Sequence, residues 1–369
     1  MGNSTPKKCL IGIMLLAIVA MVRPAAAEPI YVLFTVDVET RTASGQSVEL
    51  DIWGKVAGHT PAHGIERMMD ILDAHRAKGT FFVNVYGIPT HGEEALAAVC
   101  RLISDRGHDV ELHTHPKPMF GVGYMQHADL STQTEILAAG ARLIKAWIEK
   151  TPIAHRAGGY MANTDTLVAC HEAAIPMDFS YNVAWPASGL SAANLTRNAP
   201  LAHEGVMIVP VTAYVQASLG NWRSLRFLDI ESSSPAEIRA AVRDLHGHGV
   251  RTAVIMMHSF SFVRFGEPNL RVEQALDELV AEFVADPDVK VVTARDLYEI
   301  WKRDPEALSG SDYLPTTGWW LTYCRAWQRL DEGWKNVAVA FAPLVPATVV
   351  AGGGALWWRR RRKRTRNAA

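Results

Sequence analysis

Short apolar runs alternate with longer amphipathic runs from residue 28 to about residue 304, and this alternation constrains the fold more than any other feature. Residues 30–36 and 80–85 have the continuous apolar character of buried strands, whereas residues 65–77 repeat apolar side chains at helical spacing. The pattern continues with expected strands at 109–112, 153–155, 177–179, 206–209, 252–257 and 289–292, and expected helices at 93–106, 132–150, 235–245, 271–284 and 294–302. Strands that alternate with helices predict a parallel α/β sheet or barrel, and the length suits a single domain. Outside the expected strand at 206–209, residues 185–234 follow neither period, so we expect them to form loops over the barrel mouth.

The N-terminus has the pattern of an export signal. Lys7 and Lys8 precede an apolar run at residues 10–22, and the alanines at 25–27 give a small-residue cleavage site. An uncleaved anchor helix is the alternative, but the run is shorter than the ~20 residues that span a bilayer. We therefore expect residues 1–27 to be a signal peptide and residues 28–305 to form the exported catalytic domain.

The C-terminus holds a second apolar stretch at residues 337–358, which a basic tail at residues 359–369 follows at once. This stretch is long enough to cross a bilayer as a helix, and a positive flank favours retention on the cytoplasmic side. We expect a transmembrane helix there, with residues 306–336 as a juxtamembrane segment and the catalytic domain outside the cytoplasmic membrane. The tail also resembles C-terminal sorting signals of some Gram-negative bacteria, and a buried terminal helix is the third alternative.

Charge and cysteine content exclude two classes of protein. The formal net charge is -1, and the one dense basic cluster is the tail, where seven of the eight residues from Arg359 to Arg366 are Lys or Arg, which argues against a nucleic-acid binder. The cysteines outside the signal peptide are Cys100, Cys170 and Cys324, and an odd number at such wide spacing predicts no disulfide framework.

Polar side chains follow one apolar strand after another along the chain. The residues in question are Asp37 and Glu39, His113 and His115, Arg156, Asp178, and His258. Because the carboxyl ends of barrel strands share one face, distant parts of the chain are expected to converge there.

His113 and His115 form the most specific of these pairs. On extended backbone, residues two apart point to the same side, so both imidazoles can reach one metal ion. Two nitrogens and one carboxylate leave a coordination position open for water, as catalytic zinc sites do. Two hydrogen-bonded loop histidines are the alternative, just as Asp37 and Glu39 could be surface carboxylates and His258 a buried structural histidine.

The motifs, taken in order, carry a family resemblance. They are Thr35-Val36-Asp37-Val38-Glu39, Leu112-His113-Thr114-His115-Pro116, Arg156-Ala157-Gly158-Gly159-Tyr160 and Met257-His258-Ser259. In this combination the chain resembles the polysaccharide deacetylases, also called carbohydrate esterase family 4 or the NodB homology domain, from about residue 30 to residue 300. It is most similar to a divergent branch with an HxH metal motif, like deacetylases of lipopolysaccharide or capsule biosynthesis.

The resemblance implies a distorted, partly closed (β/α) barrel and a divalent metal cofactor, with Zn²⁺ favoured. Its metal ligands would be Glu39, His113 and His115. Its general base would be Asp37, braced by Arg156. Two departures from the family pattern concern this centre: Val38 stands where a second aspartate is usual, and the histidines are two residues apart instead of four.

The resemblance also assigns the rest of the catalytic machinery. His258 would be the general acid and Asp178 would orient it, while the backbone N–H of Tyr160 would bind the oxyanion. Trp53, Trp185 and Trp222 are candidates for stacking on sugar rings, although each is equally explained by ordinary packing.

The expected function is therefore metal-dependent hydrolysis of acetyl groups, N-acetyl before O-acetyl, on an envelope or exported polysaccharide. One alternative is an amide hydrolase that acts on a substrate other than carbohydrate, using the same barrel. Another is a catalytically silent protein for carbohydrate binding or assembly.

Overall fold

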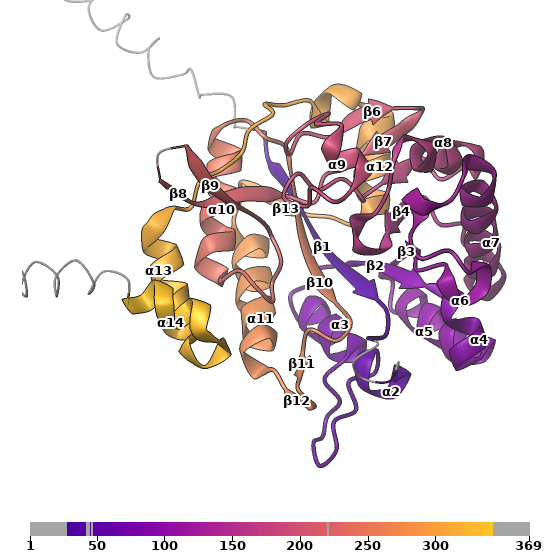
Figure 1. The fold of residues 1–369 in the computed structure, drawn as a ribbon, viewed down its shortest axis with the longest axis horizontal. Coiled ribbons are helices and arrows are strands. Elements are labelled where there is room, and N and C mark those ends of the chain that lie inside the picture. The colour runs from indigo at the N-terminus through magenta and orange to yellow at the C-terminus, as the bar shows by residue number, and fades with distance from the viewer. Residues whose placement is uncertain (1–27, 42–44, 46, 220, 342–369) are drawn as a thin grey trace, which may run out of the picture.

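A nine-stranded sheet forms the centre of the molecule and is curled into an open half-barrel (Figure 1). The computed structural model describes residues 28–341, except residues 42–44, 46 and 220. The strands follow the order β10 (Thr252–His258), β1 (Ile30–Val38), β2 (Thr80–Asn84), β3 (Asp109–Thr114), β4 (Ala154–Ala157), β5 (Met177–Asp178), β7 (Val206–Ile208) and β6 (Leu201–His203), with β13 (Val289–Val291) also paired to β1. All these pairs are parallel except β6 with β7. The predicted distorted, partly closed α/β barrel is confirmed.

Helices cover the outer side of the half-barrel (Figure 1). They are α3 (Ile65–Ala74), α5 (Glu93–Asp105), α7 (Leu130–Ile148), α8 (Thr164–Glu172), α10 (Pro235–Gly247) and α11 (Leu270–Ala285), whereas α12 (Ala294–Arg303) packs at one end of the half-barrel. Each expected helix is present with its ends shifted by at most a few residues. Helix α8 was not expected. Its start is defined by a capping box, in which the side chains of Asn163 and Thr166 each bond the other's backbone N–H.

Shorter elements join these strands and helices. They are the helices α2 (Val48–Asp51), α4 (Ile88–His91), α6 (Lys117–Phe120) and α9 (Gly189–Ala192), the strand pair β11 (Val263–Arg264) and β12 (Glu267–Pro268), and the 3₁₀ turns η2 (Val85–Gly87), η3 (Met125–His127), η4 (Gly158–Tyr160), η5 (Pro305–Leu308) and η6 (Leu330–Glu332). Turn η4 follows β4 directly and therefore lies at the carboxyl ends of the strands.

Strand β1 shows how the sequence separates two cores. Every residue of β1 is buried, as expected for a strand that is covered on both sides. Val32 and Phe34 pack with the outer helices, whereas Leu33 packs into the interior of the half-barrel. Inside, Leu33 and its neighbours meet Ala294 and Leu297 of α12. Helix α12 therefore fills the amino end of the half-barrel.

Residues 185–234, which we expected to be loops, contain regular structure in addition to β6 and β7. Strands β8 (Ala213–Leu219) and β9 (Trp222–Phe227) form an antiparallel hairpin. Strand β8 is buried over most of its length, whereas β9 carries exposed and half-buried residues on both faces. In β8 the alternation of apolar and polar residues is confined to residues 215–219, and β9 does not keep it, so the pair gives a weak strand signal.

The folded body continues past residue 305. Residues 306–336, which we expected to be a juxtamembrane segment, include helix α13 (Gly318–Gln328), and α14 (Trp334–Phe341) follows it. The buried guanidinium of Arg325 pairs with Glu237 of α10 at 3.2 Å, and the Thr322 hydroxyl donates to the Gln216 carbonyl of β8. This segment is therefore packed against the barrel.

Some of the segments predicted at the two termini lie outside the described residues. The predicted signal peptide and most of the predicted transmembrane helix, residues 342–358, lie there with the basic tail. None of the helices within residues 28–341 combines the length and the apolar character that a bilayer span requires.

Candidate active site

Strand alternation brings most of the predicted site residues to the inner side of the half-barrel. On β1, Asp37 lies four residues after Leu33, so its side chain points to the same interior side. On β10, His258 lies four residues after the interior residue Val254 and also points inward. The parallel register pairs Asp37 with His258 and His113 with Arg156. Four strands therefore present these side chains near their carboxyl ends.

Asp37 and Arg156 form a buried ion pair. The guanidinium of Arg156 donates to the Asp37 carboxylate at 2.7 Å and to the Thr35 hydroxyl at 3.0 Å. It also lies 4.3 Å from the centroid of the Phe82 ring. Because Arg156 is fully buried, these contacts fix its position and with it the orientation of Asp37.

Glu39, His113 and His115 bring three potential metal ligands together. Their donor atoms all lie within 4.8 Å of one another. The Glu39 carboxylate is 2.5 Å from Nε2 of His115 and 3.4 Å from Nε2 of His113. The two imidazole rings meet edge to face, with centroids 4.9 Å apart. Both Nε2 atoms therefore face the same carboxylate, as ligands of a single ion must.

Two details of the surroundings fit a divalent metal at this centre. His113 donates through Nδ1–H to the Arg156 carbonyl oxygen at 2.9 Å, which leaves its Nε2 lone pair for a ligand. Gly158 lies so close to His115 that an added Cβ would overlap the imidazole ring. The glycine therefore makes the room in which His115 reaches the centre. One carboxylate and two imidazoles are a donor set that zinc commonly takes.

The charges of this centre stabilise one another. Burial raises the pKa of Glu39, but the hydrogen bonds and charges of His113 and His115 outweigh it and hold the pKa well below its usual value. Burial lowers the pKa of His113, yet the negative charges of Asp37 and Glu39 dominate and raise it. The site therefore favours an anionic carboxylate beside positive charge, which a metal ion can supply in place of protons.

His258 is oriented by Glu231, and the predicted role of Asp178 in this contact is wrong. Nδ1 of His258 is 3.0 Å from the Glu231 carboxylate, and the Ser261 hydroxyl donates to the same oxygen. Burial lowers the pKa of His258, but the hydrogen bond and charge of Glu231, with the charges of Glu39 and Asp37, raise it to about 9. The imidazole is therefore held as a cation at neutral pH.

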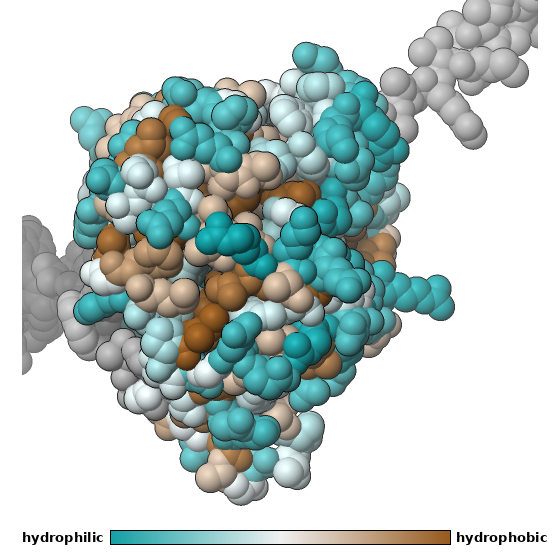
Figure 2. Space-filling view, turned by 90° about the vertical axis from the view of Figure 1, so that its right-hand side faces the viewer, coloured by the Kyte–Doolittle hydropathy of each residue, from teal (hydrophilic) through white to brown (hydrophobic). Residues whose placement is uncertain are grey.

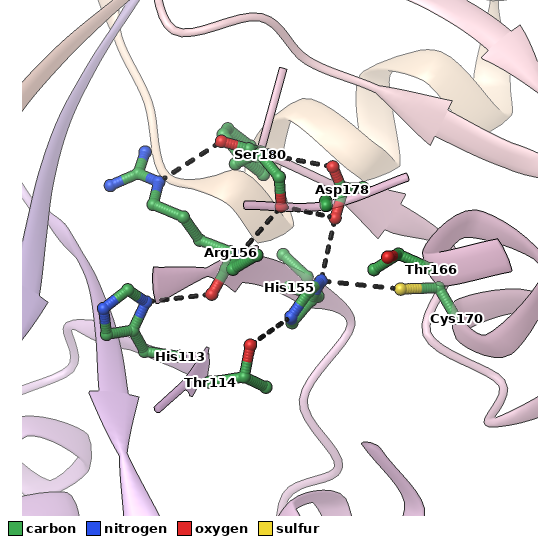
Figure 3. A network of polar contacts seen from close by, with 12 residues as sticks. His113, Thr114, His155, Arg156, Thr166, Cys170, Asp178 and Ser180 are labelled. Carbon is green, nitrogen blue, oxygen red and sulfur yellow. Dashed lines mark hydrogen bonds and ion pairs between the residues drawn. The ribbon is translucent and has the colours of Figure 1, made fainter. Parts of the chain in front are cut away.

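Asp178 cannot reach His258 because it lies on the opposite side of the sheet. In β5, Met177 points into the interior core, and so does Phe179 directly after the strand, which turns Asp178 outward. There its carboxylate accepts from Nδ1 of His155 at 2.8 Å and from the Ser180 hydroxyl at 2.9 Å. Figure 3 shows this outer network, with the Arg156 guanidinium on the other side of β4.

The outer network supports the loop that carries the site. The Ser180 hydroxyl accepts from the Ala157 N–H at 2.9 Å, directly before turn η4. Nε2 of His155 meets the Thr114 hydroxyl, which lies between the two metal-centre histidines in the chain. The Cys170 sulfur approaches the same His155 nitrogen as Asp178, so the three do not form a nucleophile relay, in which the nucleophile and the acid would contact different nitrogens.

Turn η4 places Tyr160 beside an aromatic wall. Its ring meets Trp185 and Phe227 edge to face, with centroid distances of 6.3 and 5.7 Å. The buried phenolic oxygen has no hydrogen-bond partner among the described residues. Of the other tryptophans proposed for sugar stacking, Trp53 packs against the main core and Trp222 lies on the β8–β9 hairpin, stacked on Trp319.

A cavity of about 580 Å³ opens beside the metal centre. Glu39 and His115 line it together with Arg41, Lys117 and Tyr124. Two residues of the candidate centre are thus accessible from a space that can hold a sugar unit.

The sequence analysis missed Glu231, which lies in the stretch we expected to be loops. The residues that precede it do carry a signal, because Leu228-Asp229-Ile230-Glu231 repeats the spacing of the two carboxylates after β1. Asp229 lies beside β10, forming a parallel bridge with Met256. Burial and the charge of Glu231 raise the pKa of Asp229.

An open parallel barrel with carboxylate and imidazole side chains at its strand ends fits the expectation of a fold like the NodB homology domain. Residues 58–176 match the family model described as Polysaccharide deacetylase. The match contains both histidines of the candidate centre and Arg156, whereas β1 and β10 lie outside it. Over this segment the chain is similar to the polysaccharide deacetylases.

Solved structures share the fold. A protein from Mycobacterium smegmatis, provisionally described as a polysaccharide deacetylase, is 22% identical, with 76% of this chain and 93% of that chain covered and a TM-score of 0.52. The 4-alpha-glucanotransferase from Thermococcus litoralis is 11% identical, with 74% of this chain but 40% of that chain covered and a TM-score of 0.50. At these identities the likeness concerns the fold alone. No curated protein matches this sequence significantly.

Proposed function

We propose that this protein is a metal-dependent deacetylase that removes N-acetyl groups, and less readily O-acetyl groups, from the sugars of an envelope or exported polysaccharide. The observation that carries the proposal is the convergence of three groups at one end of the half-barrel. They are the Glu39–His113–His115 cluster, the Asp37–Arg156 pair and the His258–Glu231 pair.

Different residues of the chain would bind the metal and accept the proton during amide hydrolysis. A divalent cation held by Glu39, His113 and His115 supplies, when bound, the Lewis acidity that polarises the acetyl carbonyl and acidifies a water molecule. Asp37, fixed by Arg156, accepts the proton of the attacking water.

His258 completes the reaction on the leaving group. Its Nδ1 is occupied by Glu231, which leaves Nε2 to deliver a proton. As the carbon–nitrogen bond breaks, that proton passes to the departing sugar amine, and acetate is the second product. The raised pKa of His258 supports this role, because the imidazolium is the form that can donate.

Two groups near turn η4 are candidates for contact with the substrate. The backbone N–H of Tyr160 stays our candidate for binding the oxyanion. Trp185, with its ring partly exposed beside Tyr160, offers a face for a sugar ring.

The location of the reaction is part of the proposal. An export signal at residues 1–27 and an apolar segment at residues 337–358, followed by the basic tail, support a catalytic domain outside the cytoplasmic membrane.

Release of acetate from an N-acetylated chito-oligosaccharide by the Zn²⁺-loaded full chain tests the function. We expect turnover that a chelator abolishes, and we expect His113→Ala to lose both bound zinc and turnover. Turnover of a cyclic amide in place of the oligosaccharide would establish the amide hydrolase instead. Glycan binding without turnover would indicate a silent binding protein.

A further inference from the structure

Helix α13 has its polarity inverted relative to an ordinary surface helix. Its buried face carries Thr322 and Arg325, both of which bond to the barrel. Its outward face carries Trp320, 72% exposed, and Trp327, with Tyr323 between them in the chain. A surface helix normally places charged and polar residues outward, so this outward face is suited to an environment other than bulk water.

The outward rings of α13 and one ring of the β8–β9 hairpin form two groups, which the neighbouring residues Trp319 and Trp320 join along the chain. Trp320 stacks on Tyr323 at a centroid distance of 5.8 Å, and Tyr323 meets Trp327 edge to face. On the other side, Trp319 stacks on Trp222 of the hairpin, which is 56% exposed. We name these five residues the aromatic face.

The chain itself indicates what covers the aromatic face. Helix α14 follows at once, and in the sequence it leads into an apolar stretch that ends at Trp358, directly before Arg359. If that stretch crosses a bilayer, the membrane surface lies within a few residues of α14. Tryptophan and tyrosine are the residues that gather in the interfacial layer of membranes, and six of the eleven tryptophans lie between Trp319 and Trp358.

We propose that the aromatic face rests in the interfacial layer of a phospholipid bilayer and docks the catalytic domain against the membrane. This inference rests on the proposed membrane location and is independent of the reaction. Figure 1 shows α13 and the β8–β9 hairpin on one side of the molecule and α7 on the other, and Figure 2 shows that hydrophilic and hydrophobic residues are mixed over the α7 side. Docking through the aromatic face would therefore hold the catalytic domain in one orientation, with α7 away from the bilayer.

Site-specific photo-crosslinking tests the contact. The full chain is reconstituted into vesicles of phosphatidylcholine and phosphatidylglycerol, with p-benzoylphenylalanine placed at Trp320. The matched control carries the probe at Arg142, an exposed residue of α7. We expect roughly fivefold more lipid adduct from position 320 than from position 142, because only the aromatic face enters the interface. Because Trp320 is exposed and remote from the catalytic groups, acetate release by both labelled proteins should match that of the unmodified chain.

Three outcomes would overturn the inference in distinguishable ways. Vesicle-bound protein with equally low adduct at both positions would refute docking but leave the membrane location standing. Protein that does not float with the vesicles would refute both, while acetate release would still report on the proposed reaction. An adduct to added chito-oligosaccharide, with none to lipid, would make the aromatic face a glycan-binding platform instead.

Discussion

At the scale of single residues, the two carboxylates at the end of β1 have different partners, so their substitution should have different effects on activity and metal binding. Asp37 contacts Arg156, whereas Glu39 contacts both histidines. Asp37→Asn keeps the hydrogen bonding but cannot accept a proton, so turnover should fall by roughly 10²- to 10⁴-fold with zinc retained. Glu39→Ala should instead lose zinc affinity, and excess zinc should restore part of the activity. Metal content and acetate release, measured together, would reveal reversed roles if zinc were lost only from Asp37→Asn.

The pH dependence should identify the partner of His258. The imidazolium exists below its pKa, which is raised to about 9, so activity should persist through neutral pH and fall as pH rises past about 9. Glu231→Gln removes the main interaction that raises this pKa and leaves the effect of burial, which lowers it. The alkaline limb of kcat/KM against pH should therefore move to lower pH.

Asp178→Asn is the matched control for this shift. Because Asp178 bonds His155 and Ser180 on the outer side of the sheet, we expect an unchanged alkaline limb. The free energy of unfolding should fall by roughly 1–3 kcal/mol, since a buried hydrogen-bond network is disturbed. A displaced limb in this variant alone would restore the role first predicted for Asp178.

Gly158→Ala should weaken the metal centre without touching a ligand. The added methyl group would overlap the His115 ring and force the imidazole away from Glu39. Zinc affinity should fall by about tenfold or more, a loss typical of disturbed ligand support. Gly247→Ala is the control, because a methyl group there meets nothing. Equal zinc affinity in both variants would show that His115 is not a ligand.

The residues that sequence analysis could place were those that follow regular strands. Period-two alternation from apolar neighbours predicts the inward direction of Asp37 and His258. The same rule applied to β5 turns Asp178 outward, but a strand of two residues gives too little pattern for the rule to be used. Glu231 stayed hidden because its approach to His258 depends on the path of the chain after β9, which no local period encodes.

At the scale of elements, α13 should stabilise the barrel through a buried charge. Glu237 is fully buried, where it caps α10 through Ser234 and accepts from Gln216 as well as pairing with Arg325. Arg325→Ala would leave this carboxylate without its counter-ion. We expect a loss of roughly 3–5 kcal/mol in the free energy of unfolding, measured by denaturant titration.

Trp320→Gln is the control for Arg325→Ala, because the replaced ring is on the outward side of the same helix. It should change the free energy of unfolding little. Similar small effects from both substitutions would mean that α13 contributes little to the stability of the barrel.

Elements with clear periodicity were predictable, and elements that break it were not. The outer helices have wide apolar faces because each packs on the sheet, so their sequences report their structure. The sequence of helix α13 does not predict its packing in this way, because Trp320 and Trp327 point outward whereas Thr322 and Arg325 are buried. Its position against β8 depends on contacts such as the bond from Trp319 to the Ser218 carbonyl, which is distant in sequence.

At the scale of the whole molecule, the proposed anchor makes a prediction about extraction. If residues 342–358 complete a span, the full chain should stay in the membrane pellet after alkaline carbonate treatment, because only integral segments resist it. Immunoblotting of pellet and supernatant gives the answer. The intact chain in the supernatant would remove the anchor, whereas a shortened chain there would indicate a cleaved sorting tail.

The pairing of β1 with β10 has a consequence for how the protein is made. Asp37 and His258 are neighbours in register, yet more than half of the chain separates them in synthesis. The candidate base is therefore among the first residues to emerge, and its catalytic partner must wait for the last third of the polypeptide. A chain that is still being synthesised would thus be inert toward its substrate, and competence would arrive when β10 docks beside β1.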